Sequence, residues 1–181
     1  ATNGACSKTA EVSFEIERAA WNSTSWNTPP DAHKSFLFAG DYNRNADNRT
    51  LIDGCDCTVT SGAVTIASDH VLKLKNELNV NGGSMTIEND ASLVQINNVT
   101  NTGNIVYKRT APSIRGFDYV YWSSPVANQN IETIYTSPIS GLKYQWNPTI
   151  ANGNGGQGNW ETASGNMQRA KGYIIRGSSN Y

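Results

Sequence analysis

The sequence predicts an all-β protein in which a short right-handed parallel β-solenoid precedes an antiparallel, aromatic-rich β-sheet or sandwich unit. Slid against itself by about 21 residues, the stretch 57–77 falls on the stretch 78–98, and this spacing is typical of solenoid repeats. From about Gly116 the repetition stops and aromatic residues become frequent. We therefore expect about three solenoid coils in residues 34–110 and the antiparallel unit in residues 111–181.

The composition narrows the classes of function. The 181 residues include 14 Lys and Arg and 15 Asp and Glu, which gives a formal net charge of −1. A nucleic-acid-binding protein needs a concentrated basic face, so we expect no nucleic-acid partner. No apolar run is long enough to cross a membrane, so we expect no membrane insertion. Many Asn, Ser, Thr and Gly residues are typical of an exposed, turn-rich β protein.

Residues 1–18 are expected to contain one strand, because Val12, Phe14 and Ile16 alternate with polar residues. A lone strand is unstable and needs a partner. Two placements stay open: the last strand of a preceding immunoglobulin-like module, or the first strand of the present domain. The abrupt start and stop of the sequence lead us to expect a piece of a longer polypeptide.

Residues 19–33 are expected to form a linker or cap. Trp21 and Trp26 lie in a polar segment that ends in two prolines. Two such tryptophans could stack on a sugar, but a lid over the open end of a core is the favoured interpretation.

A degenerate first coil is expected before the two clear ones. Residues 34–40 have strand character, and Phe38 lies one repeat length before Val59. Leu51 likewise lies one repeat length before Leu72, which predicts that this pair also stacks.

The loop from Asp41 to Asn48 within this coil carries acid and amide oxygens on alternate positions, as calcium loops do. Ala46 replaces the sharp-turn glycine, and Ile52 stands where a bidentate Glu is required. A solvated turn fits this loop better than a calcium site does. We therefore expect no cofactor, with bound calcium as the alternative.

A further coil is expected to begin near residue 102, one residue short of the repeat. Gly103 then aligns with Gly62 and Gly83, and Tyr107 aligns with Ile87 at the end of an interior column. The strand pattern ends shortly afterwards at Pro112.

Two polar columns of the repeat invite a functional interpretation. Asp69 and Asp90 occupy equivalent turn positions, about 4.8 Å apart in a stack, where a cation could bridge them. We favour two carboxylates that face solvent. Asn76 and Asn97 are expected to hydrogen-bond as a ladder that stabilises the stack.

The cysteines and histidines form no recognisable site. Cys55 and Cys57 lie on one face of an extended segment, too far apart for an unstrained disulfide, and Cys57 is expected to be buried. Cys6 has two open pairings, with Cys55 or with a cysteine upstream of the sequence. No CxxC or histidine pair accompanies them, which argues against zinc. His33 and His70 are expected at the surface without a catalytic or metal role.

An enzyme is not expected. Solenoid lyases and glycosidases need carboxylates clustered on one outer face across several coils. Here Glu88 aligns with Ala67, and Lys73 aligns with Val94, so no charged column forms. We assign no catalytic residue, no cofactor-binding residue and no metal ligand.

The antiparallel unit holds the candidate glycan-binding residues. Trp146 and Trp160 flank a glycine-rich loop, residues 152–158, and Tyr144 lies shortly before the first of them. An exposed aromatic ring near Asn or Gln is how proteins grip sugars, so these three residues are the candidates. Trp122, in an alternating strand, is expected in the core.

Part of the chain resembles a known module. The residues that carry the resemblance are Ile87-Glu88-Asn89, Ala91-Ser92-Leu93-Val94-Gln95, Thr102-Gly103-Asn104-Ile105, Lys108-Arg109, Asp118-Tyr119, Tyr121-Trp122-Ser123-Ser124-Pro125-Val126, Tyr144, Trp146-Asn147, Trp160, Met167 and Lys171-Gly172-Tyr173-Ile174-Ile175. Together they resemble a module near the C-terminus of very large secreted surface proteins of Bacteroidota. Those proteins are similar to adhesins, carry immunoglobulin-like repeats and leave the cell by the type IX secretion system. The resemblance covers about residues 21–176.

The resemblance implies a secreted, cell-surface location and a structural or adhesive role, which we expect to serve surface attachment or gliding motility. The implied partners are other domains of the same polypeptide and the type IX secretion machinery, and the aromatic candidates add surface polysaccharides as expected partners. The family continues into more β structure and a C-terminal sorting domain, which this sequence does not contain, and it supplies no catalytic residues. The alternative function is a carbohydrate-binding module of a secreted multidomain enzyme.

Overall fold

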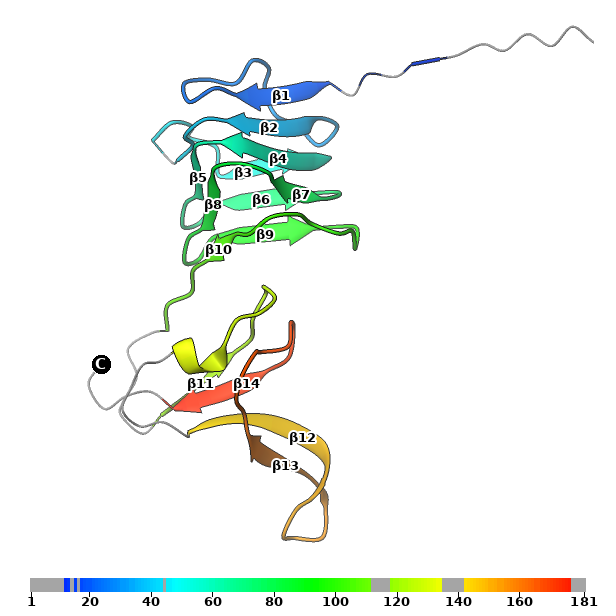
Figure 1. Ribbon diagram of the computed structural model, residues 1–181, viewed down its shortest axis with the longest axis vertical. Helices are drawn as coiled ribbons and strands as arrows, with labels where there is room; N and C mark the ends of the chain where they lie inside the picture. Colours follow the sequence, from blue (N-terminus) through cyan, green and yellow to red (C-terminus); the bar gives the residue numbers. More distant parts are fainter. Residues whose placement is uncertain are drawn as a thin grey trace, which may run out of the picture. The chain divides into compact units, whose positions relative to one another are not determined.

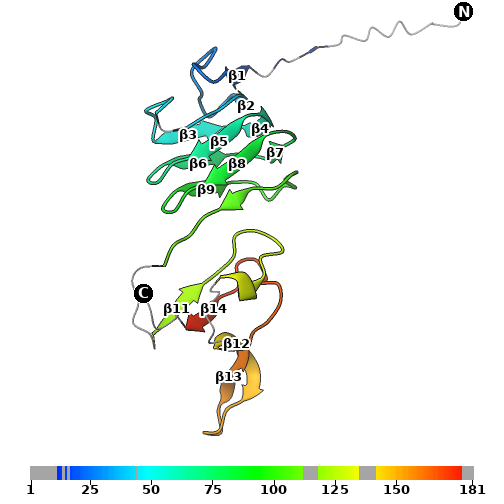
Figure 2. The same cartoon turned by 60° about the vertical axis from the view of Figure 1, so that its left-hand side comes forward.

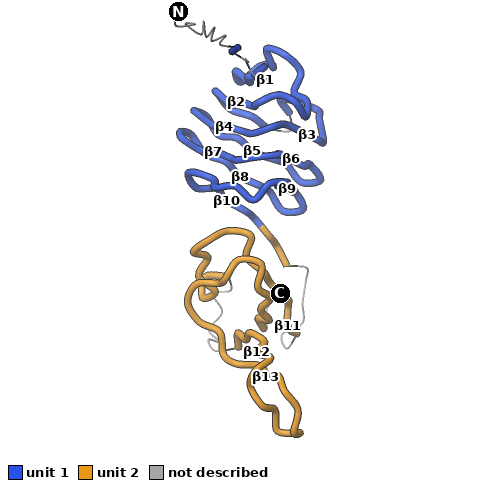
Figure 3. The backbone as a smooth tube through the Cα atoms, turned by 90° about the vertical axis from the view of Figure 1, so that its right-hand side faces the viewer, with its two compact units in different colours: residues 1–108 blue, residues 109–181 orange. Residues whose placement is uncertain are grey.

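A computed structural model of the chain describes residues 12, 13, 15, 17–43, 45–111, 118–134 and 142–176. These residues form strands, turns and one short 3-10 helix, η1 (Ile131–Thr133), so the predicted all-β class is confirmed. None of the described helices is long and apolar enough to span a membrane. The chain divides into two compact units, residues 1–108 and residues 109–181 (Figure 3).

The first unit is a parallel β-solenoid of about four turns, and the strands of its stacked coils form three sheets (Figure 1). All strand pairings within these sheets are parallel. The first sheet contains β1 (Arg18–Trp21), β2 (Ser35–Ala39), β4 (Asp56–Ser61) and β7 (Leu78–Val80). The second contains β5 (Ala63–Ile66), β8 (Ser84–Ile87) and β10 (Val106–Tyr107), and the third contains β3 (Leu51–Gly54), β6 (Val71–Leu74) and β9 (Ser92–Gln95).

The predicted repeat register is confirmed between the two complete coils. The side chains that meet there are mostly apolar and together form one continuous core. Stacking is needed for this, because a single coil has no second layer to cover its apolar face. The stacked pairs are Cys57 with Leu78, Val59 with Val80, Val64 with Met85, Ile66 with Ile87 and Leu72 with Leu93.

The first coil follows a different register in β3. Ile52, not Leu51, lies beside Leu72, so the predicted stacking of Leu51 on Leu72 is wrong. The cause is an uneven coil length. The interval between Tyr42 and its bridge partner Val64 is longer than the repeat, whereas the interval between Ile52 and Leu72 is shorter. A one-residue slip exchanges the two faces of a strand, and Ile52 is accordingly buried while Leu51 is 50% exposed.

The solenoid begins earlier than residue 34. The strand β1 pairs in parallel with β2 and places Trp21 beside Phe38, so part of the expected linker is the first rung. Trp21 is buried, and its indole contacts that of Trp26 at a centroid distance of 5.5 Å. Trp26 packs in turn on Phe38, as a lid over the interior should. The alternating strand expected at residues 12–16 falls partly outside the described residues.

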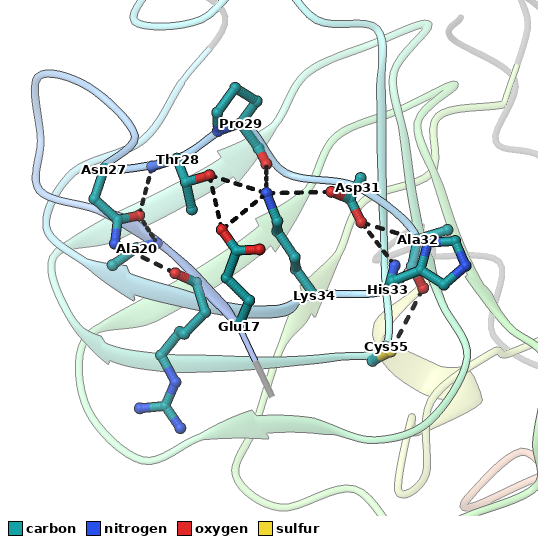
Figure 4. Close-up of polar contacts among 11 residues, drawn as sticks. Glu17, Ala20, Asn27, Thr28, Pro29, Asp31, Ala32, His33, Lys34 and Cys55 are labelled. Carbon is teal, nitrogen blue, oxygen red and sulfur yellow. Dashed lines mark hydrogen bonds and ion pairs between the residues drawn. The ribbon is translucent and has the colours of Figure 1, made fainter. Parts of the chain in front are cut away.

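Lys34 anchors the segment that carries this lid (Figure 4). Its Nζ donates to Thr28 Oγ1 at 2.9 Å and to the Pro29 carbonyl at 3.0 Å, and it pairs with Glu17 at 3.3 Å and Asp31 at 3.2 Å. Desolvation lowers the pKa of Lys34, but the bonds to the two carboxylates outweigh it and the pKa lies above its ordinary value. The cation therefore ties the loop to the start of β1 and β2.

Glycines line one corner of the solenoid, as their alignment predicts. Gly62, Gly83 and Gly103 all have positive φ, of 79°, 71° and 78°. A Cβ atom at any of them would lie within 2.3 Å of backbone atoms one coil earlier. Only glycine allows both this conformation and this close approach.

The second unit is an antiparallel sheet with its own core. Its strands β11 (Tyr119–Trp122), β14 (Tyr173–Arg176), β12 (Lys143–Ala151) and β13 (Gln157–Thr162) lie in that order. The strands β12 and β13 form a hairpin whose tip extends past the other two strands (Figure 2). The buried residues behind the sheet are Ile131, Ala163, Met167, Tyr173 and Ile175.

Candidate functional site

The four strands of the second unit give its sheet two unlike faces, because side chains alternate along each strand. The inner face packs on the core, and among its residues are Trp122, Lys143, Gln145, Glu161, Tyr173 and Ile175. Trp122 is partly buried there, as expected. The outer face consists of Tyr119, Tyr121, Tyr144, Trp146, Trp160, Thr162, Ile174 and Arg176.

Trp146 and Trp160 form a cross-strand pair on the outer face. They lie directly opposite each other in β12 and β13. Their ring centroids are 5.3 Å apart with an interplanar angle of 72°, an edge-to-face arrangement that aromatic rings favour. Trp146 is 45% exposed and Trp160 is 41% exposed. Both are therefore accessible to a ligand, as the sequence predicts, while binding itself stays a prediction.

Gly158 fixes the position of the Trp146 ring. It is buried, with a φ of +96°, and a Cβ atom there would lie 2.3 Å from Trp146 Cζ2. The indole thus lies against a stretch of backbone that only glycine leaves bare. The Trp146 ring also contacts the Trp160 ring. The sheet therefore holds the Trp146 ring in place in the absence of a ligand.

Tyr144 extends the aromatic surface toward the opposite edge of the sheet. Its ring reaches across β14 to that of Tyr119, with centroids 6.2 Å apart. Tyr119 is 41% exposed and Tyr121 is 78% exposed, and neither was a candidate from the sequence. The alternation of side chains along the strand could have identified these two residues. If the Trp122 side chain points inward, those of residues 119 and 121 lie together on the opposite, outer face.

Hydrogen bonds on the inner face hold the hairpin register behind the tryptophans. Glu161 accepts from Gln145 Nε2 at 2.6 Å and from Asn147 Nδ2 at 3.2 Å. Lys171 Nζ donates to Gln145 Oε1 at 2.7 Å. Gln145, Asn147 and Glu161 are sequence neighbours of the two tryptophans and point the other way. Their hydrogen bonds therefore stabilise the strand pairing without entering the outer face.

The side chains of the suggested calcium loop are engaged with the fold. Asp41 Oδ1 accepts from the Ala63 amide at 2.8 Å. Asp47 Oδ2 accepts from Trp26 Nε1 at 2.7 Å and pairs with Arg49 at 3.3 Å. Among the described residues, no group of three or more His, Cys, Asp or Glu side chains is placed to hold a metal ion.

Asp69 and Asp90 are exposed turn residues. Both adopt left-handed backbone conformations, with φ of 64° and 63°, which Asp tolerates better than most residues. This agrees with the solvent-facing interpretation. The Asn column also forms as expected, because Asn97 Nδ2 donates to Asn76 Oδ1 at 2.9 Å.

Cys57 is fully buried, as expected, and burial raises the pKa of its thiol above the usual range. Cys55 is a free thiol in the structure, and Cys6 lies outside the described residues. The side chain of His33 is exposed, but the expectation of a surface position for His70 is wrong. His70 is only 8% exposed because its ring folds back on the turn, with Nδ1 2.8 Å from the Ser68 carbonyl oxygen.

Fold and site define a parallel β-solenoid followed by an antiparallel sheet with a solvent-exposed aromatic face. The chain belongs to the family described as "Domain of unknown function (DUF8693)", which matches residues 18–181. The match begins at the first residue of β1 and extends through all strands of both units. No curated protein and no solved structure matches the chain.

Proposed function

We propose that the chain is a non-enzymatic structural and adhesive module of a large secreted bacterial cell-surface protein. The observation that carries the proposal is the contrast between its two units. The solenoid buries most of its large apolar side chains in its own interior, and its exposed apolar residues are aliphatic. The sheet instead presents five aromatic rings on one face, Tyr119, Tyr121, Tyr144, Trp146 and Trp160. The solenoid would act as a spacer and the sheet as the surface that attaches.

The outward side chains of the solenoid support a scaffold role. Lys73 pairs with Asp53 of the preceding coil at 2.9 Å, and Lys108 pairs with Glu88 at 2.7 Å. Exposed pairs of this kind contribute at most about 1 kcal/mol each, so their main effect is on alignment of the coils. These charges contact one another across coils instead of converging on a common point, which favours a scaffold over a catalytic surface.

The resemblance to surface proteins of Bacteroidota supplies the proposed setting. In it the chain is exported by the type IX secretion machinery and works beside other domains of the same polypeptide in surface attachment or gliding. Surface polysaccharides are the proposed external partners.

An in-frame deletion of residues 18–176 from the parent protein tests this role. We expect the shortened protein to be exported and labelled by antibody on intact cells, while attachment of the cells to a surface falls. Loss of the type IX machinery should abolish the labelling of both versions. Unchanged attachment by the deletion strain would refute the adhesive role, and labelling without that machinery would refute the proposed route.

A carbohydrate-binding module of a secreted multidomain enzyme is the second candidate. The exposed pair of Trp146 and Trp160 favours it, because amphipathic rings held in a fixed geometry suit a sugar face. The complete open reading frame separates the two candidates. A catalytic domain in it would favour the enzyme, whereas an array of immunoglobulin-like repeats with a sorting domain would favour the adhesin.

A further inference from the structure

We infer that the outer face of the antiparallel sheet binds a neutral, linear polysaccharide that runs across all four strands. Tyr119 and Tyr121 would contact the ligand together with Tyr144, Trp146 and Trp160. The inference rests on the adhesive role proposed above and names the chemistry of the external partner.

The aromatic residues extend from one edge of the sheet to the other. Trp160 lies on β13, Trp146 and Tyr144 lie on β12, and Tyr119 and Tyr121 lie on β11. Three strand spacings separate β11 from β13, a span of about 14 Å across a sheet. Such a span accommodates several sugar rings in a row, whereas the tryptophan pair alone would contact a shorter stretch of the chain.

The rings approach one another in two contacts. Trp146 and Trp160 are 5.3 Å apart, and Tyr144 and Tyr119 are 6.2 Å apart. Trp146 and Tyr144 stand at alternate positions of one strand and so share a face. The resulting surface carries indole N–H and phenol O–H groups beside apolar rings, as a sugar with an apolar face and hydroxyl edges requires.

The charges of the sheet favour a neutral ligand. On β12 and β13 the charged side chains are Lys143 and Glu161, and both belong to the inner face. There Lys143 pairs with Glu132, and Glu161 bonds to Gln145. On the outer face of the four strands the only charged residue is Arg176, which is partly buried. An acidic polysaccharide carries repeated charge and would need a row of cations.

The site is prepared before binding. Gly158 and Trp160 fix the Trp146 ring, and the inner-face hydrogen bonds of Glu161 hold the two strands in register. A surface that needs little ordering loses little affinity to conformational entropy when a ligand binds.

Affinity electrophoresis of the 181-residue chain tests the inference. Native gels would contain, one at a time, mixed-linkage β-glucan, glucomannan, hydroxyethylcellulose or the acidic polysaccharide alginate. We expect retardation by at least one of the three neutral polymers and none by alginate. The variants are Trp146→Ala, Tyr121→Ala and Tyr121→Phe, with Ile96→Ala as control, since Ile96 is a 59% exposed apolar residue of the solenoid.

Trp146→Ala and Tyr121→Ala should each raise the Kd for the retarding polymer by about fivefold or more, the loss typical of an aromatic contact residue. Ile96→Ala should bind like the parent chain, and Tyr121→Phe should lose less affinity than Tyr121→Ala because it keeps the ring and loses only the O–H. Near-UV circular dichroism should confirm that every variant is folded. The absence of retardation by any neutral polymer, or retardation by alginate alone, overturns the inference.

Two further results separate this inference from the adhesive role. If Trp146→Ala fails to bind while Tyr121→Ala binds normally, a ligand spanning four strands is refuted and only a site at the tryptophan pair survives. If no polysaccharide binds and deletion of residues 18–176 still reduces attachment, the polysaccharide is refuted and the adhesive role stands.

Discussion

Replacing Gly158 by alanine should disorganise the tryptophan pair, and neighbouring glycines allow the cause to be dissected. At Gly158 two penalties combine: a φ of +96° and a Cβ that would lie 2.3 Å from Trp146 Cζ2. Gly155 has a φ of +80° and no atom within 4 Å of its added Cβ. Gly153 carries neither penalty and lies in the same hairpin. The three substitutions therefore separate backbone strain from the contact with the ring.

The expected losses of unfolding free energy follow from these two terms. Gly153→Ala should change stability by less than about 1 kcal/mol, with either sign. Gly155→Ala should cost about 1–2 kcal/mol for a left-handed conformation. Gly158→Ala should cost about 2–4 kcal/mol, because the ring also leaves its rotamer and its edge-to-face contact.

Urea unfolding followed by tryptophan fluorescence measures these losses, and the exciton couplet of the paired indoles in circular dichroism reports their geometry. The couplet should weaken in Gly158→Ala and persist in Gly155→Ala. In a Trp146→Ala background the extra cost of Gly158→Ala over Gly155→Ala should vanish. Equal losses for the two alanines in the parent chain, with the couplet intact, would refute the idea that Gly158 holds the ring.

Three other predictions concern the solenoid. Ile52→Ala should cost about 2–5 kcal/mol in urea unfolding and Leu51→Ala less than about 0.5 kcal/mol, and the reverse order would contradict the register of β3. Asn97→Ala should cost about 0.5–1.5 kcal/mol and be non-additive with Asn76→Ala, whereas simple additivity would argue against the ladder. Above the ordinary thiol pKa of about 8.5, the unfolded chain releases a proton that folded Cys57 retains, so stability should fall as pH rises. Unfolding measured between neutral and alkaline pH should show a shallower fall for Cys57→Ala, and identical slopes would refute this.

The sequence predicted the solenoid best where its repeat is strict. Cys57 stacks on Leu78 at the expected spacing because the coil between them has the full repeat length. The predicted register was wrong at Leu51. One interval around the first coil is longer than the repeat and the next is shorter, and comparing the sequence with itself at one fixed spacing does not detect such compensating changes. The first rung was missed for a similar reason, because the interval between Trp21 and its partner Phe38 is much shorter than the repeat.

The candidate site was predictable in part. Exposure of Trp146 and Trp160 followed from their positions beside a glycine-rich loop, but their direct pairing depends on the hairpin register and a bulge. Alternation with Trp122 could have marked Tyr119 as an outward residue of its strand, but placing it beside Tyr144 required the strand order, in which β14 inserts between β11 and β12. That order is fixed by long-range packing, and local periodicity carries no information about it.

The parallel stacking of the coils also has a mechanical consequence. The backbone hydrogen bonds of a solenoid join one coil to the next, so a pulling force along the stack acts on the rungs in series and opens them one after another, the weakest first. Each coil that opens loses one strand spacing of about 4.8 Å and releases about 70 Å of extended chain. Under tension we expect stepwise lengthening of the solenoid, and force–extension traces of single molecules should resolve such steps.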